Sequence, residues 1–108
     1  MSEDAKSWEV PGRAHLLGVC GVGMAGLARL LVRRGWCVSG CDAHPGALAA
    51  WLREGGVPVE AGHSPAHVAG AAAPDCVIAT PAVRPDEPER AAAAALGLRV
   101  ACRGEVLA

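Results

Sequence analysis

Phenylalanine and tyrosine are absent from this 108-residue sequence, which contains three tryptophans. A hydrophobic core must therefore be built from aliphatic side chains, and few aromatic faces are available for stacking against nucleic-acid bases. Positive charge is also sparse, because nine arginines and one lysine are scattered without a basic run and the net charge is −1. We therefore expect no nucleic-acid partner.

The sequence also lacks a long apolar run. Glycine, arginine or proline interrupts each apolar stretch well before the ~18 residues that a membrane span needs. The first ten residues, MSEDAKSWEV, are acidic and polar, unlike a signal peptide. We expect a cytoplasmic location and no membrane partner.

A C-x-x-C pair is missing as well, and the cysteines are odd in number: Cys20, Cys37, Cys41, Cys76 and Cys102. Most of them lie in apolar, strand-like runs. We expect reduced, buried thiols that act as small hydrophobic groups, with a reactive thiol or a metal ligand as the alternative. No metal site is predicted.

Strand-like and helical patterns alternate along the chain. Hydrophobic residues make up 52% of it and charged residues 19%, as in a folded globular domain. We predict five strands, over 14–20, 36–41, 57–61, 75–79 and 98–102. Helices are predicted between them, over 24–34, over 47–54, in a short segment that contains His67 and in a stretch that ends at Leu96. Another helix is predicted to begin after residue 103. This order predicts an α/β, Rossmann-like, doubly wound domain over 14–108, with a mostly parallel sheet of about five strands and helices on both faces. Residues 1–13 form a polar lead-in.

The segment LLGVCGVGMAGL, residues 16–27, runs from an apolar strand through closely spaced glycines into a helix. Gly21, Gly23 and Gly26 fit the G-x-G-x-x-G spacing of dinucleotide-binding folds. Glycine lets a ligand approach the backbone, and the first turn of a helix offers free N–H groups and a positive dipole end. The segment therefore predicts a site for a diphosphate.

Polar residues follow the ends of three other predicted strands, at the edge where open α/β sheets bind ligands. Asp42 lies about 20 residues after the glycine turn, the distance at which an acid reads a ribose, although it could instead cap the next helix. His63 and the loop Thr80-Pro81-Ala82-Val83 follow the third and fourth strands, with an ordinary connecting role as the alternative. For His15 and His67 we favour structural roles over ligand contacts.

Several motifs occur together in order: GVCGVGMAGLA (18–28), VSGCD (38–42), Gly62-His63, TPAV (80–83), D-x-P-E (86–89) and RGEVL (103–107). In this combination the chain resembles the N-terminal domain of the Mur ligases, most closely those that add L-alanine to UDP-N-acetylmuramate. The resemblance implies that the domain binds the UDP part of that substrate. Asp42 would lie near the uridine and His63 near the diphosphate. The phosphates would be cradled by Gly21, Val22, Gly23, Met24, Ala25 and Gly26, and the nucleoside pocket lined by Thr80, Pro81 and Ala82.

The resemblance further implies an ATP-dependent, Mg²⁺-supported ligase that forms an amide bond to L-alanine through an acyl phosphate. This sequence contains no G-K-[ST] phosphate loop, and its one lysine is Lys6. We therefore expect it to hold no catalytic residue and no cofactor of its own. The central ATPase domain and the C-terminal domain would lie beyond residue 108.

Three other interpretations stay open. Cys20 stands where the alanine-adding members usually carry glycine, and is reminiscent of the related ligase that recycles a murein tripeptide. A second departure from the alanine-adding members is the segment TPAV (80–83), which replaces a loop that more often begins with two serines. The G-x-G-x-x-G spacing with Asp42 also fits an NAD(P)-binding domain of an oxidoreductase, and a regulatory or interaction module is the third possibility.

Overall fold

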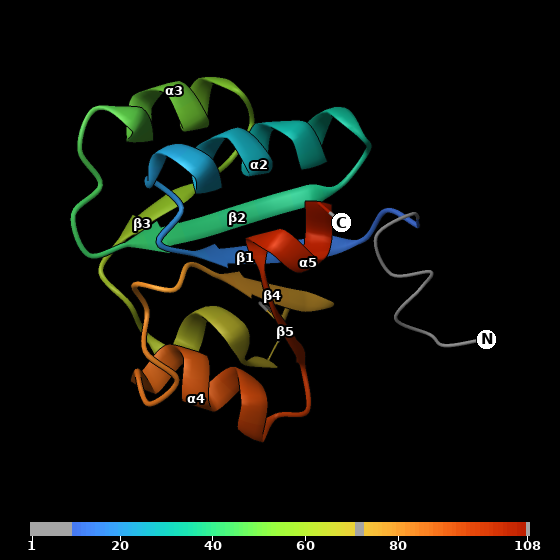
Figure 1. Cartoon of the computed structure of the whole chain (residues 1–108), viewed down its shortest axis with the longest axis vertical. Coiled ribbons are helices and arrows are strands. Elements are labelled where there is room, and N and C mark those ends of the chain that lie inside the picture. Colours follow the sequence, from blue (N-terminus) through green and yellow to red (C-terminus); the bar gives the residue numbers. More distant parts are fainter. Residues whose placement is uncertain (1–9, 71–72, 108) are drawn as a thin grey trace.

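The computed structural model describes residues 10–70 and 73–107, so residues 1–9 of the predicted lead-in lie outside the described part. Five strands alternate with helices (Figure 1). The first half of the chain forms β1 (Arg13–Leu17), α2 (Val22–Arg33), β2 (Cys37–Asp42), α3 (Leu48–Glu54) and β3 (Val59–Ala61). The second half forms the short 3₁₀ helix η1 (Pro65–Val68), β4 (Cys76–Ala79), α4 (Pro88–Ala95), β5 (Arg99–Cys102) and α5 (Arg103–Leu107).

The strands form one sheet in the order β3-β2-β1-β4-β5, and every pairing is parallel. Helices α2 and α3 cover one face, while α4 and η1 cover the other (Figure 1). The chain reverses its direction of winding between β1 and β4, which opens a crevice at the carboxyl ends of these two strands. The predicted doubly wound fold is confirmed.

The predicted first strand was too long, because β1 ends at Leu17 rather than at residue 20. Gly18 has a φ of +79°, a left-handed conformation that suits glycine and leaves the extended path. The N–H groups of Gly18 and Val19 then both donate to the carbonyl of Cys41, at 2.9 and 3.1 Å. The chain thus turns at the point where β2 passes beside it.

The sheet buries different chemistry on its two faces. The face under α2 and α3 is an aliphatic core that includes Leu16, Leu31, Leu52 and Ile78. The face under α4 and η1 has a smaller apolar cluster, which includes Leu17, Val68 and Val77. Two buried polar residues, His15 and Glu89, lie there as well.

Each helix contributes one apolar stripe to these cores. Helix α2 buries Met24, Leu27, Ala28 and Leu31, at the spacing of one helical face. No helix in the described ranges combines the length and apolar character that crossing a membrane requires.

Candidate functional site

The glycine turn brings the N-terminus of α2 to the crevice. The N-cap is Gly21, which has an extended backbone and no side chain to cap the helix. The first N–H groups of α2 therefore keep their donor capacity for a ligand, at the positive end of the helix dipole. Such an end favours an anion.

Asp42 lies at the end of β2 and holds the glycine turn in place. Its Oδ2 accepts a hydrogen bond from the N–H of Cys20 at 3.0 Å, and its Oδ1 accepts one from the N–H of His44 at 2.9 Å. Helix α3 begins instead after Ala47, with no side-chain cap. The alternative that Asp42 caps the next helix is therefore wrong.

Two neighbouring clefts lie along this edge of the sheet. The first, called the glycine cleft, has a volume of about 420 Å³. It is lined by Gly21, Val22, Gly23, Met24, Thr80, Pro81, Cys102, Arg103 and Gly104. The second, called the Asp42 cleft, has a volume of about 340 Å³ and is lined by Gly18, Gly21, Asp42, Ala43, His44, His63, Thr80, Ala82 and Val83.

The clefts share Gly21 and Thr80, so they adjoin. Nine of the eleven sequence-predicted site residues line one or both of them. The two that do not both belong to α2: Ala25 lies on its buried side and Gly26 on its exposed side. A Cβ added at Gly26 would meet nothing within 4 Å. The structure therefore separates Gly26 from the other glycines of the motif.

Close approach explains two of the remaining glycines. A Cβ at Gly18 would collide with the methyl group of Thr80, so glycine allows the loop after β4 to pass beside the turn after β1. A Cβ at Gly23 would lie 3.0 Å from Cζ and 3.1 Å from Nε of Arg103. Arg103 therefore lies directly over the first turn of α2.

Arg103 was not among the predicted site residues. It begins α5, directly after β5, and brings a guanidinium to the glycine cleft. Arginine pairs well with phosphate because its planar group donates two parallel hydrogen bonds. The RGEVL segment was noted as a motif, but its position over Gly23 depends on a packing that spacing in the sequence does not reveal.

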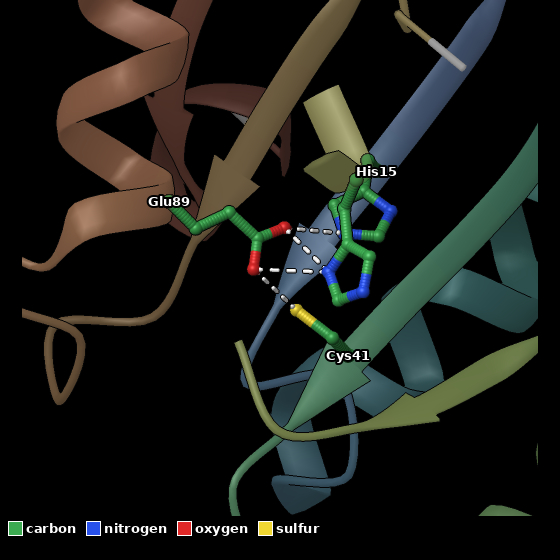
Figure 2. A group of neighbouring side chains, drawn as sticks. His15, Cys41 and Glu89 are labelled. Atoms are coloured by element: carbon green, nitrogen blue, oxygen red, sulfur yellow. Dashed lines mark hydrogen bonds and ion pairs between the residues drawn. The ribbon is translucent and has the colours of Figure 1, made fainter. Parts of the chain in front are cut away.

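A second group of polar side chains is centred on Glu89 of α4 and has His63 in common with the Asp42 cleft. Figure 2 shows Glu89 reaching toward His15 and Cys41 on neighbouring strands. Glu89 Oε2 lies 2.8 Å from His15 Nε2, and Oε1 lies 3.1 Å from Cys41 Sγ. His67 Nδ1 is 3.1 Å from both oxygens, and His63 Nδ1 lies 3.5 Å from Oε1. We call these five residues the Glu89 cluster.

The contacts of the Glu89 cluster set its protonation. Burial by itself would raise the pKa of the Glu89 carboxyl, but hydrogen bonds from His15, Cys41 and the N–H of Ser64 outweigh burial and lower that pKa to about 2. Burial, followed by the hydrogen bond to Glu89 and its charge, raises the pKa of the Cys41 thiol. Glu89 is thus an anion and Cys41 a thiol donor to it.

The sequence interpretation missed this cluster. Glu89 was noted only as the last residue of the D-x-P-E motif, and structural roles were favoured for His15 and His67. A signal was present, since His15 interrupts an otherwise apolar strand that is covered on both faces. A buried imidazole there requires a hydrogen-bonding partner, although the partner lies 74 positions away.

Comparison with known proteins adds an independent result. The sequence model described as "Mur ligase family, catalytic domain" matches residues 13–108. The chain is 50% identical over 97 residues to the UDP-N-acetylmuramate–L-alanine ligase of Kineococcus radiotolerans, covering 90% of this chain and 21% of that protein. It is 48% identical over 100 residues to the ligase of the same name from Deinococcus radiodurans, covering 87% and 21%.

Solved structures agree. The UDP-N-acetylmuramate-alanine ligase of Thermotoga maritima is 32% identical with a TM-score of 0.79, over 89% of this chain and 22% of that one. A murein peptide ligase from Psychrobacter arcticus is also 32% identical, with a TM-score of 0.76, over 82% and 18%. The chain thus spans about a fifth of the length of these relatives.

These matches do not support the alternative of an oxidoreductase domain, since the relatives that share both sequence and fold are ligases. The G-x-G-x-x-G spacing alone left this alternative open, because the spacing is typical of phosphate-binding turns in general and does not specify the nucleotide. The chain belongs to the Mur ligase family.

Proposed function

We propose that this chain forms the part of a UDP-N-acetylmuramate:L-alanine ligase that binds the UDP group of UDP-N-acetylmuramate. The observation that carries the proposal is the uncapped N-terminus of α2, which opens on the glycine cleft beneath the guanidinium of Arg103. The names of the relatives supply the identity of the nucleotide.

The diphosphate belongs in the glycine cleft. The free N–H groups after Gly21 donate to phosphate oxygens, and the helix dipole favours their negative charge. Arg103 adds a formal positive charge beside the phosphates, since its guanidinium packs against Gly23 and lines the same cleft. Because Gly23 has no side chain, the phosphates can approach the backbone closely.

The nucleoside belongs in the adjoining Asp42 cleft. The Asp42 carboxylate already accepts two backbone hydrogen bonds and retains lone pairs that can accept from ribose hydroxyls. His63, Thr80 and Ala82 line the same cleft. Asp42 thereby connects the geometry of the glycine turn to the recognition of the sugar.

The complete reaction of the family requires ATP and Mg²⁺, and the residues present here do not fit a site for ATP. The sequence contains no G-K-[ST] loop, so no lysine is placed to hold the phosphates of ATP. We assign these residues the binding and orientation of one substrate, and we assign the amide bond to L-alanine to the longer ligases that the chain resembles. The five cysteines are free, which fits the reducing cytoplasm in which we place this reaction.

Titration calorimetry of this chain with UDP-N-acetylmuramate, UDP and NADH tests the proposal. We expect both uridine ligands to bind and NADH not to bind. Tight binding of NADH with no response to either uridine ligand would overturn the proposal. Gly23→Val should weaken UDP binding at least about 10-fold, because its methyl groups would enter the space between α2 and Arg103.

Gly26→Val is the matched control, because it adds the same side chain to the same helix where a Cβ meets no atom within 4 Å. Arg103→Ala should weaken UDP binding about 10-fold, the contribution expected of one charged hydrogen-bonding group. Asp42→Asn should weaken it less. Equal affinities for the Gly23 and Gly26 variants would place the phosphates elsewhere.

A further inference from the structure

We propose that four members of the Glu89 cluster, His15, Cys41, His67 and Glu89, form a binding site for Zn²⁺. The proposal does not depend on UDP binding. Each residue offers one ligand atom, and these four atoms all lie within 4.8 Å of one another. Two imidazole nitrogens, one thiolate sulfur and one carboxylate oxygen make up a set of ligands that suits Zn²⁺.

The ligands come from four different elements. His15 lies on β1, Cys41 on β2, His67 on η1 and Glu89 on α4. Neighbouring ligand atoms in a tetrahedral zinc site lie roughly 3.3–3.8 Å apart, given bond lengths of about 2.0–2.3 Å. The contacts to Glu89 are 2.8–3.1 Å. An ion would therefore replace these hydrogen bonds after the ligand atoms separate by roughly half an ångström.

Ser39 supplies the outer contact that a zinc-binding histidine needs. Its hydroxyl lies 2.7 Å from Nδ1 of His15. With a proton on Nδ1, His15 donates to this hydroxyl and leaves the lone pair of Nε2 for the metal. Residues of this kind fix the tautomer and the orientation of the ring in known metal sites.

Charge also favours a divalent cation. The Glu89 side chain has no exposed surface, and the ion-pair contacts described for it are with three histidines. A thiolate at Cys41 and the Glu89 carboxylate carry two negative charges, which Zn²⁺ neutralises while the imidazoles stay uncharged. On binding, the Cys41 proton leaves to solvent, and His15 and His67 carry their protons on the nitrogens that face away from the metal.

The site has an entrance. A cleft of about 290 Å³ is lined by His15, Ser39 and His67, among others. The side chain of His67 is 20% exposed, so an ion can reach the cluster past this ring.

A second combination of possible ligands, His63 and Glu89 of the cluster with Glu87, is less suitable. Glu87 is the N-cap of α4, and its Oε1 accepts hydrogen bonds from the N–H groups of Glu89 and Arg90 at 2.7 and 3.1 Å. Coordination by Glu87 would compete with the cap that begins the helix. We therefore assign the ion to the four residues that join β1, β2, η1 and α4, where it would fasten the outer helices to the sheet.

Titration of the metal-free chain with Co²⁺, a spectroscopic substitute for Zn²⁺, tests this site. We expect one equivalent to bind, with visible bands of tetrahedral cobalt and a thiolate-to-cobalt charge-transfer band, and we expect Zn²⁺ to displace it. Cys41→Ser should abolish the charge-transfer band and weaken Zn²⁺ binding more than about 100-fold. Absence of the band in the unmodified chain would overturn the proposal.

Cys37→Ser is the matched control, since Cys37 lies on the same strand but is exposed. It should keep both the band and the affinity, and loss of the band in this variant would overturn the proposal by indicating adventitious thiol binding. His67→Gln is a second test at a partly exposed position, should Cys41→Ser fail to fold. It should also weaken Zn²⁺ binding, and an unchanged affinity would contradict the assignment.

Thermal unfolding gives a second measurement of metal binding that does not depend on the absorption bands of cobalt. Zn²⁺ at about 100 times its dissociation constant should raise the melting temperature by about 10 °C. The same addition should leave Cys41→Ser and His67→Gln almost unchanged. An equal rise in these variants and in the unmodified chain would show that the ion binds elsewhere.

Discussion

Strand β1 presents Ala14 and Leu16 to the face of the sheet under α2 and α3, and His15 and Leu17 to the face under α4 and η1. All four residues are buried. The first face is stabilised by contact between hydrocarbon groups, which has no direction and little dependence on pH. The second depends on hydrogen bonds to one carboxylate, which are directional and require that carboxylate to be ionised. The comparison indicates that equal burial need not mean equal sensitivity to conditions.

The largest effect is expected from removing the charge at Glu89. Glu89→Gln keeps the size of the side chain but turns one acceptor oxygen into a donor amide, which then faces other donors. We expect a loss of about 3 to 5 kcal/mol in the free energy of unfolding, measured with urea at neutral pH in the presence of a chelator.

Asp86→Asn is the control for this change, because it neutralises an acid that precedes the same helix but is exposed. It should alter stability by less than about 0.5 kcal/mol. If Glu89→Gln were as mild as this control, the carboxylate would not organise the α4 face.

The second-largest effect should be a difference between the two faces in how their contribution to the free energy of unfolding depends on pH. The folded-state pKa of Glu89 is about 2, below its ordinary value of 4.5. Its contribution is therefore fully present above about pH 4.5 and is lost as the pH falls toward 2, by about 3 kcal/mol in total. Urea unfolding at a series of pH values measures this fall.

Leu16→Ala provides the comparison from the apolar face. It should lower the free energy of unfolding by about 3 kcal/mol, through lost burial and a cavity. The loss should be the same at each pH, so a plot of the free energy of unfolding against pH should run parallel to that of the unmodified chain. In Glu89→Gln, by contrast, the fall in the free energy of unfolding below about pH 4.5 should be smaller. If Glu89→Gln showed the same fall in the free energy of unfolding at acid pH as the unmodified chain, other groups would cause the pH dependence.

The smallest effect is expected on the outer side of α2, which belongs to neither buried face. Gly26 lies there with open space around it, so Gly26→Ala should stabilise the chain by up to about 1 kcal/mol through helix propensity. Thermal unfolding measures the change. A destabilisation would mean that the glycine serves a close contact, as Gly23 and Gly18 do.

Local patterns predicted the order of the elements and the edge of the sheet where the site lies, because apolar periodicity and glycine turns act within a few residues. They predicted Asp42, His63 and Thr80 at one edge, since the strands are parallel. They did not predict the position of Arg103 over Gly23, or the convergence of His15, Cys41, His67 and Glu89. These contacts join residues far apart in the sequence and depend on how the helices pack against the sheet.

The position of Arg103 over Gly23 has a consequence for the order of events in folding. The two residues are separated by 80 positions, and β5, which leads into Arg103, pairs with the sheet only through β4. The glycine cleft is therefore complete only after the edge strand β5 has paired with β4. A ligand that bridges α2 and Arg103 would select fully assembled molecules, so its binding would serve as a check on the completeness of folding.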